Sequence, residues 1–343
     1  MKKIDFETHF ATQGWVDALY QNKGYPRFER DPETDSLRLC YHPAAREPYG
    51  DALVAKLLDL GEGRLKQMDA AGIDLAVISL TTPGAEQFER ALGVKLAREA
   101  NDTLAEAIDK HPDRYQGFAA LPIQDTDAAA RELERAVKEL GLKGWKTHCN
   151  YGDSYLDEKR YWPLLAKAEE LGAIVYLHPT VPNIPDFWTY GVALAGPPFG
   201  FGIATALAMM RLVLSGAFDA FPKLKIVLGH YGEGLPFLMQ RIDWAFERPH
   251  VKSDKGALVA LKKKPSEYLR DSMMVTTSGN YLPAAFKCTR EALGMDKIML
   301  GTDHPYEDMG ECLDYLESLG LSAQEKDMLY GGNAARMGFA GHE

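Results

Sequence analysis

The chain has 343 residues, of which 46% are hydrophobic and 26% are charged, and its formal net charge is −10 at pH 7. These values are typical of an ordinary soluble globular protein. The acidic balance and the lack of a long Lys/Arg cluster exclude a surface that tracks nucleic acid.

Two further features bear on the compartment. The uncharged stretch between Asp186 and Arg211 is interrupted by Pro197 and Pro198. We therefore expect a loop that leads into a buried helix, and no membrane span. The 4 cysteines lack CxxC spacing, which indicates reduced thiols in a cytoplasmic protein.

Short apolar runs alternate with amphipathic stretches along the chain. The expected strands are Ile4–Phe10, Leu75–Leu80, Tyr115–Leu121, Gly144–Cys149, Ile174–His178, Ile226–His230, Met273–Thr277 and Ile298–Thr302. Helical periodicity predicts helices over Val54–Ala71, Gly84–His111, Ala128–Leu140 and Glu158–Leu171. This alternation favours an α/β fold, a (β/α)8 TIM barrel that forms one domain over residues 1–343. A doubly wound open sheet is the alternative, although no GxGxxG or Walker loop follows the first strand.

The segment 22–50 is rich in Pro, Arg and Tyr and has no periodicity. We expect it to be an insertion after strand 1 that covers one mouth of the barrel or contacts another subunit. Tyr49 or Arg46 would then reach a substrate pocket across that boundary, and Arg64 is a weaker candidate.

Ionisable side chains recur at the ends of predicted strands, where barrel enzymes build their sites. Glu7 and His9 share one face of the first strand, His178 ends the fifth, and Asp303 follows the eighth. Two imidazoles and two carboxylates suit one divalent metal ion, Mn²⁺ or Zn²⁺. The sequence therefore predicts a metal site formed by Glu7, His9, His178 and Asp303.

Further polar residues lie close to this set in the predicted fold. His230 ends the sixth strand, and Glu233 is placed to accept a hydrogen bond from its ring. Arg241 follows on the same helix and either forms a surface salt bridge or binds a carboxylate. Lys146 and His148 share one face of the fourth strand, so we expect them either in the substrate pocket or, with a carbamylated Lys146, at a second metal ion.

Several blocks of the sequence resemble a known family, the amidohydrolase-type decarboxylases of hydroxylated benzoates. They are ETHF, IVYLHP, the stretch containing GHYGEGLPFLMQRID, and GTDHPYE. The first block is similar to the decarboxylase branch, because hydrolases of the wider superfamily usually open with HxH. The resemblance implies one metal held by Glu7, His178 and Asp303, with His9 as a fourth ligand.

The resemblance also implies a reaction and roles. A small aromatic carboxylic acid with an ortho hydroxyl would lose CO₂ after Asp303 protonates the ring, with His230 and Glu233 as a catalytic pair and Arg241 on a polar substituent. A negatively charged, dry pocket would raise the pKa of Asp303 enough for it to donate. The uncharged segment offers an apolar wall, formed by Phe187, Trp188, Tyr190, Phe199 and Phe201.

Two other functions remain open from the sequence. A hydrolase on the same barrel would cleave a lactone, ester or C–C bond and would need an activated water; a scaffold that binds metal without turnover is the third reading. Members of the family are typically oligomeric, so we expect a homodimer or homotetramer.

Overall fold

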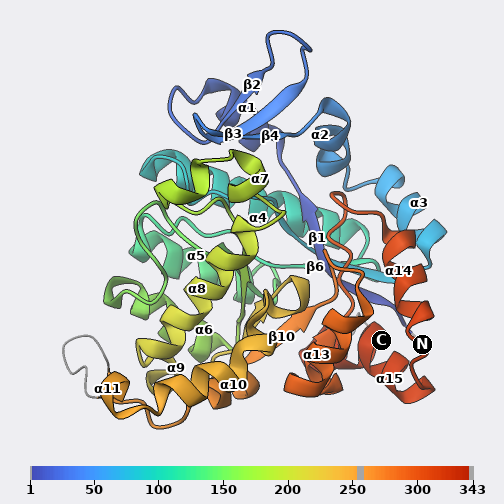
Figure 1. The fold of residues 1–343 in the computed structure, drawn as a ribbon. Helices are drawn as coiled ribbons and strands as arrows, with labels where there is room; N and C mark the ends of the chain where they lie inside the picture. Colours follow the sequence, from blue (N-terminus) through green and yellow to red (C-terminus); the bar gives the residue numbers. More distant parts are fainter. Residues whose placement is uncertain (1, 253–258, 340–343) are drawn as a thin grey trace.

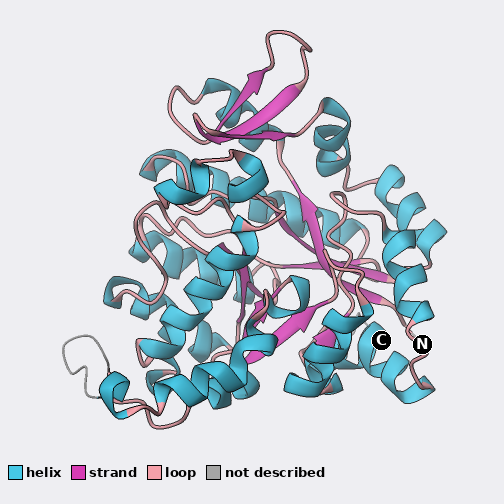
Figure 2. Cartoon of the chain, viewed as in Figure 1, coloured by secondary structure: helices cyan, strands magenta, loops and turns pink. Residues whose placement is uncertain are grey.

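Parallel strands occupy the centre of the molecule in the part of the chain that the structure describes, residues 2–252 and 259–339 (Figure 2). In this computed structural model they form two arcs, in the orders β1-β5-β6 and β11-β10-β9-β8-β7. The strands are β1 (Ile4–Phe10), β5 (Leu75–Leu80), β6 (Tyr115–Gly117), β7 (Gly144–His148), β8 (Ile174–His178), β9 (Ile226–Leu228), β10 (Met273–Thr276) and β11 (Ile298–Met299).

Backbone hydrogen bonds join the two arcs at both ends. The amide of Ala119, just after β6, donates to the carbonyl of Gly144 in β7 at 2.8 Å. On the other side, Phe6 of β1 donates to the carbonyl of Leu300 at 2.8 Å, and Asp303 donates to the carbonyl of Glu7 at 2.9 Å. The strands therefore close into the predicted barrel, and the doubly wound open sheet is wrong.

Helices surround the barrel (Figure 1). They are α1 (Gln13–Gln21), α2 (Asp51–Leu58), α3 (Glu62–Ala71), α4 (Arg90–Lys110), α5 (Thr126–Lys138), α6 (Trp162–Leu171), α7 (Val192–Ala195), α8 (Gly200–Leu214), α9 (Ala217–Ala220), α10 (Leu235–Phe246), α11 (Pro249–Lys252), α12 (Pro265–Ser272), α13 (Pro283–Leu293), α14 (Met309–Ser318), α15 (Ala323–Asp327) and α16 (Asn333–Arg336). The helix expected over Val54–Ala71 is two helices, because the Asp59 carboxylate accepts from the amide of Gly61 and turns the chain.

A β-bulge in β1 decides which side chains point into the barrel. Phe6 and Glu7 together face the single residue Val77 of β5. Below the bulge, Ile4 and Phe6 pack into the inner apolar cluster with Tyr176 and Phe339. Above it the alternation is shifted by one residue, so Glu7 and His9 point inward instead. The bulge therefore separates an apolar lower layer from a polar upper layer.

The insertion forms a small antiparallel sheet of its own, which the sequence pattern did not indicate. Its strands are β2 (Arg27–Arg30), β3 (Leu37–His42) and β4 (Ala45–Pro48). The sheet lies over one end of the barrel, beside α7 (Figure 1). Tyr41 and Glu47 from this sheet line the same cavity as Asp303, so the covered end is the one where the strands finish.

The uncharged segment after β8 contains α7 and α8, as the expected loop and helix. Ala204, Ala208 and Leu212 of α8 pack into the core outside the strands. Among the described residues, none of the helices combines the length and the apolar character needed to cross a membrane.

Candidate active site

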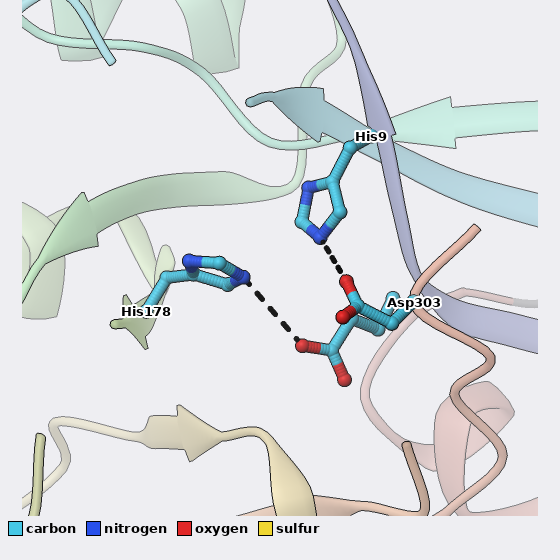
Figure 3. A group of neighbouring side chains, drawn as sticks. His9, His178 and Asp303 are labelled. Carbon is cyan, nitrogen blue, oxygen red and sulfur yellow. Dashed lines mark hydrogen bonds and ion pairs between the residues drawn. The ribbon is translucent and has the colours of Figure 1, made fainter. Parts of the chain in front are cut away.

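Four side chains meet at the upper end of the barrel, within the layer above the β-bulge. Glu7 and His9 come from β1, His178 is the last residue of β8, and Asp303 follows β11. Their ligand atoms all lie within 4.8 Å of one another. The His9 Nε2 and Asp303 Oδ1 atoms are 2.8 Å apart, and Figure 3 shows these two side chains pointing at each other with His178 facing them.

The contacts of these residues leave two atoms free for a metal ion. Thr276 and Ser278 both donate to Glu7 Oε2, while Glu7 Oε1 is buried without a hydrogen-bond partner. His178 Nδ1 lies 3.0 Å from the carbonyl of Pro179, and its Nε2 is likewise buried and unpartnered, 3.7 Å from Glu7 Oε1. Buried polar atoms without partners are costly, and a divalent cation between them satisfies both. The residues present therefore fit the predicted ion.

His230 and Glu233 form the predicted pair. The His230 Nδ1 atom lies 2.7 Å from Glu233 Oε1, and its Nε2 lies 3.9 Å from Asp303 Oδ2. Both residues have positive φ angles, 53° and 54°, in the tight turn between β9 and α10. Although burial lowers the pKa of His230, the carboxylates of Glu233 and Glu7 raise it well above its usual value. The His230 ring is thus held between Glu233 and Asp303.

Asp303 differs from the expectation in one respect. Burial raises its pKa, but the interactions with the His230 and His9 rings outweigh this effect and lower the pKa below the usual range. The idea that the pocket alone makes Asp303 an acid is therefore wrong for the unliganded chain. His230 Nε2 lies 3.9 Å from Asp303 Oδ2, close enough for a proton to pass between the two side chains.

These residues open into a cavity of about 530 Å³, within the usual range for small-molecule sites. Its apolar wall includes two of the five aromatic residues expected there, Phe199 and Phe201. The remaining lining residues are Tyr41, Glu47, Thr82, His178, Pro179, Pro197, Pro198, Gly202, Ile203, His230, Glu233, Gly234, Gly279, Asn280, Asp303, Tyr306 and Glu307.

Lys146 and His148 lie beneath this cavity and do not line it. Lys146 Nζ donates to the carbonyl of Leu80 at 2.8 Å and lies 3.4 Å from His9 Nδ1. His148 Nδ1 is 2.8 Å from Glu86 Oε1, and burial lowers the pKa of both Lys146, to about 7, and His148. The described histidine and carboxylate side chains form one group that could hold an ion, and a second ion at a carbamylated Lys146 stays a prediction.

Besides Lys146 and His148, four expected substrate contacts lie outside the cavity lining: Arg64, Trp188, Tyr49 and Arg241. Arg64 is buried under β1, where it donates to the carbonyls of His9 and Asp59, so its expected role at the substrate is wrong. Trp188 stacks on His42 at 3.8 Å and lines a separate small cavity. The hydroxyl of Tyr49 lies behind the cavity wall, 2.7 Å from the hydroxyl of Tyr306.

Arg241 is exposed on α10, where its guanidinium lies 5.1 Å from the ring of Trp244. It does not line the cavity of its own chain. Phe187 packs on the lining residue Phe199 but does not itself line the cavity. Tyr190 is 75% exposed and does not line it either. The apolar wall is therefore narrower than the aromatic composition of the segment indicated.

Several cavity residues were missed from the sequence. Tyr41 and Glu47 come from the insertion, and burial raises the pKa of Glu47 to about 7. Asn280 follows β10, and Tyr306 and Glu307 follow the last metal ligand. The block GTDHPYE contained a signal for the last two, because tyrosine and glutamate three and four residues after a strand-end ligand remain at the same mouth.

The chain is similar to characterised decarboxylases over nearly its whole length. It is 36% identical to the γ-resorcylate decarboxylase of Polaromonas sp. over 348 residues, which cover 98% of each chain. The structure of 5-carboxyvanillate decarboxylase from Sphingomonas paucimobilis superposes with a TM-score of 0.87 at 34% identity, covering 98% of each chain. A dihydroxybenzoic acid decarboxylase from Polaromonas sp., solved with manganese and the inhibitor 2-nitroresorcinol, gives a TM-score of 0.82 at 34% identity, covering 98% of this chain and 96% of that one.

The family model described as Amidohydrolase matches residues 4–337, which include all four clustered ligands. The chain therefore belongs to the amidohydrolase family, within the group that contains these aromatic-acid decarboxylases.

Proposed function

We propose that this protein is a metal-dependent, non-oxidative decarboxylase of an aromatic carboxylic acid with an ortho hydroxyl group. The observation that carries the proposal is the cluster of Glu7, His9, His178 and Asp303, of which His178 and Asp303 line a cavity of about 530 Å³. Decarboxylases similar to the chain over 98% of its length support the same reaction.

The ion is Mn²⁺ or Zn²⁺. Nitrogen and carboxylate ligands suit both, and a relative solved with manganese favours the first. Such an ion, when bound, would chelate the substrate carboxylate and its ortho hydroxyl and stabilise negative charge on them. Glu7, His9, His178 and Asp303 would hold it.

The residues of the chain move the proton. Asp303 would donate it to the ring carbon that carries the carboxylate, and His230, 3.9 Å from Asp303 and oriented by Glu233, would supply it. The C–C bond then breaks, its electrons return to the ring, and CO₂ leaves. The walls formed by Phe199 and Phe201 hold the ring flat and exclude water from this step.

The cavity also offers polar partners away from the metal. Glu47, Asn280 and Tyr306 face the space in which ring substituents would lie. Their side chains can form hydrogen bonds to hydroxyl groups of the ring. These contacts would decide which hydroxybenzoate fits.

We propose further that the protein forms a homodimer or homotetramer in the cytoplasm. Apolar side chains are exposed on two helices near the cavity, with Phe237 80% exposed and Trp244 47% exposed on α10, and Ile203 44% exposed on α8. An apolar patch formed by these side chains would mark an interface. Arg241 lies on the same helix, so a neighbouring chain would cover it. Light scattering at the 38.1 kDa of one chain would contradict the proposal.

The function is tested by CO₂ release. The Mn²⁺-loaded protein would be offered γ-resorcylate, 2,3-dihydroxybenzoate and 5-carboxyvanillate, with the Asp303→Asn variant as the matched control. We expect release from at least one acid by the wild type and a loss of at least 10³-fold in the variant, on the order of what a proton donor contributes. No release with metal bound would favour the hydrolase.

A further inference from the structure

A chain of hydrogen bonds runs from the metal ligand His178 away from the cavity. His178 Nδ1 lies 3.1 Å from the hydroxyl of Thr82, which in turn lies 3.0 Å from His148 Nε2. His148 Nδ1 is 2.8 Å from Glu86 Oε1. All four side chains are buried, Glu86 with 7% of its surface exposed.

Glu86, at the outer end of this hydrogen-bond chain, decides which atoms donate and which accept. Glu86 accepts from the amide of Ala85, the amide of His148 and the hydroxyl of Thr147, at 3.0, 3.2 and 3.3 Å. A carboxylate placed among donors accepts from His148 as well, so the Nδ1 atom of that ring carries the hydrogen. In the neutral ring Nε2 is then an acceptor, and the Thr82 hydroxyl donates to it.

The tautomer of His178, at the inner end of the hydrogen-bond chain, follows from the same matching of donors and acceptors. With its hydrogen directed to His148, the Thr82 oxygen accepts from His178 Nδ1–H. The lone pair of His178 is then on Nε2, the buried atom without a partner in the metal cluster. The carbonyl of Pro179 also lies 3.2 Å from the Thr82 oxygen, but a hydroxyl turned toward it would leave His148 Nε2 without a donor.

The local backbone is built to admit this arrangement. Gly84 has φ +74°, and a Cβ placed there would lie 2.2 Å from Glu86 Oε2 and 2.6 Å from His148 Cε1. Only glycine lets the Glu86 and His148 side chains approach the loop this closely. Trp15 Nε1 donates to the carbonyl of Gly84 and holds the loop in place.

We propose that Glu86 and His148 are positioning residues that act through Thr82 on His178, fixing its tautomer and strengthening its Nε2 as a metal ligand. The inference rests on the metal site of the proposed function and adds residues beyond the four ligands. Partners behind a metal-binding imidazole commonly change metal affinity by 10- to 100-fold. Because the Pro179 carbonyl still contacts His178, we expect the lower end of that range.

The test measures metal affinity without substrate. Thr82→Val, which removes the hydroxyl at nearly constant volume, is expected to raise the Kd for Mn²⁺ about tenfold, and Glu86→Gln, which removes the charge but keeps an acceptor, several-fold. Thr82→Ser should restore the wild-type Kd. Glu132→Gln is the matched control, because Glu132 is also buried but pairs with Arg135 and Asn101 far from the ligands.

A second measurement tests whether a change at Glu86 alters His178 through the hydrogen-bond chain. In ¹⁵N-histidine-labelled, metal-free protein, the Nδ1 signal of His178 should shift in Glu86→Gln, although no contact joins the two residues directly. Kd values within twofold of wild type in both Thr82→Val and Glu86→Gln, or an equal loss in Glu132→Gln, would overturn the proposal. Wild-type protein that binds no Mn²⁺ overturns it together with the proposed function, whereas bound Mn²⁺ without CO₂ release overturns only the latter.

Discussion

Replacing Arg64 by Met tests whether this buried arginine stabilises the fold or contacts the substrate. Its guanidinium donates to the carbonyls of His9, Asp59 and Lys56 at 2.6, 2.8 and 3.3 Å. Three hydrogen bonds from a charged group contribute about 1.5–2 kcal/mol each, about 5 kcal/mol together. Burial lowers the pKa of Arg64 from 12.5 to about 10, which corresponds to a cost of about 3 kcal/mol for the charge.

The hydrogen bonds therefore exceed the cost of the buried charge by about 2 kcal/mol, and Arg64→Met is expected to lose that much unfolding free energy. Methionine still fills the volume of the arginine stem, so no large packing loss is added. For a chain of this size the loss corresponds to a fall in Tm of roughly 3 °C. Differential scanning calorimetry measures it, with Arg30→Met as the control, since Arg30 pairs with Asp51 at the surface. An unchanged Tm combined with a raised KM would refute the reasoning and return Arg64 to the substrate pocket.

Three further predictions concern charge, metal and backbone. Because burial raises the folded-state pKa of Glu47 to about 7 from 4.5, wild-type stability falls as pH rises through this window. Glu47→Gln should therefore gain about 1–3 kcal/mol over wild type at pH 8 and nothing at pH 4.5 in thermal scans, and an equal gain at both values would contradict this. Chelation should lower Tm, and Mn²⁺ at 100 times its Kd should restore about 2.7 kcal/mol; a Tm unaffected by either would argue against the metal site. Gly84→Ala should cost about 2–3 kcal/mol in urea unfolding, and Gly141→Ala, with a similar φ of +70° but open space around its Cβ, only about 1 kcal/mol; equal losses would exclude the clash with Glu86.

The predictable parts of the site are the residues located at the ends of the parallel strands. Parallel strands in a barrel finish at one mouth, so the order of strands was enough to bring His178 and Asp303 toward Glu7 and His9. The His230–Glu233 contact followed from a separation of three residues at a strand-to-helix turn. Periodicity also gave β1, β5 and β8 with the bounds that the structure has.

The parts that were not predictable depend on packing between distant segments. Sequence spacing places Arg64 on a helix near the barrel mouth but does not indicate that its side chain turns back to the carbonyl of His9. Arg241 is on the helix expected for it, yet its side chain points to Trp244. Glu86 gave no signal, because its role depends on His148 and Thr82, which meet it only in the closed barrel.

The small sheet over the barrel mouth separates the residues that shape the cavity roof from the residues that hold the metal. The ligands at the strand ends are fixed by the geometry of the barrel, whereas Tyr41 and Glu47 belong to strands that pair only with one another. Mutations in residues 27–48 can thus remodel the cavity roof without disturbing the strands that carry the metal ligands. A lineage with this architecture can acquire new aromatic substrates by changing a surface hairpin while retaining its chemistry, and an engineer can exchange that hairpin for the same purpose.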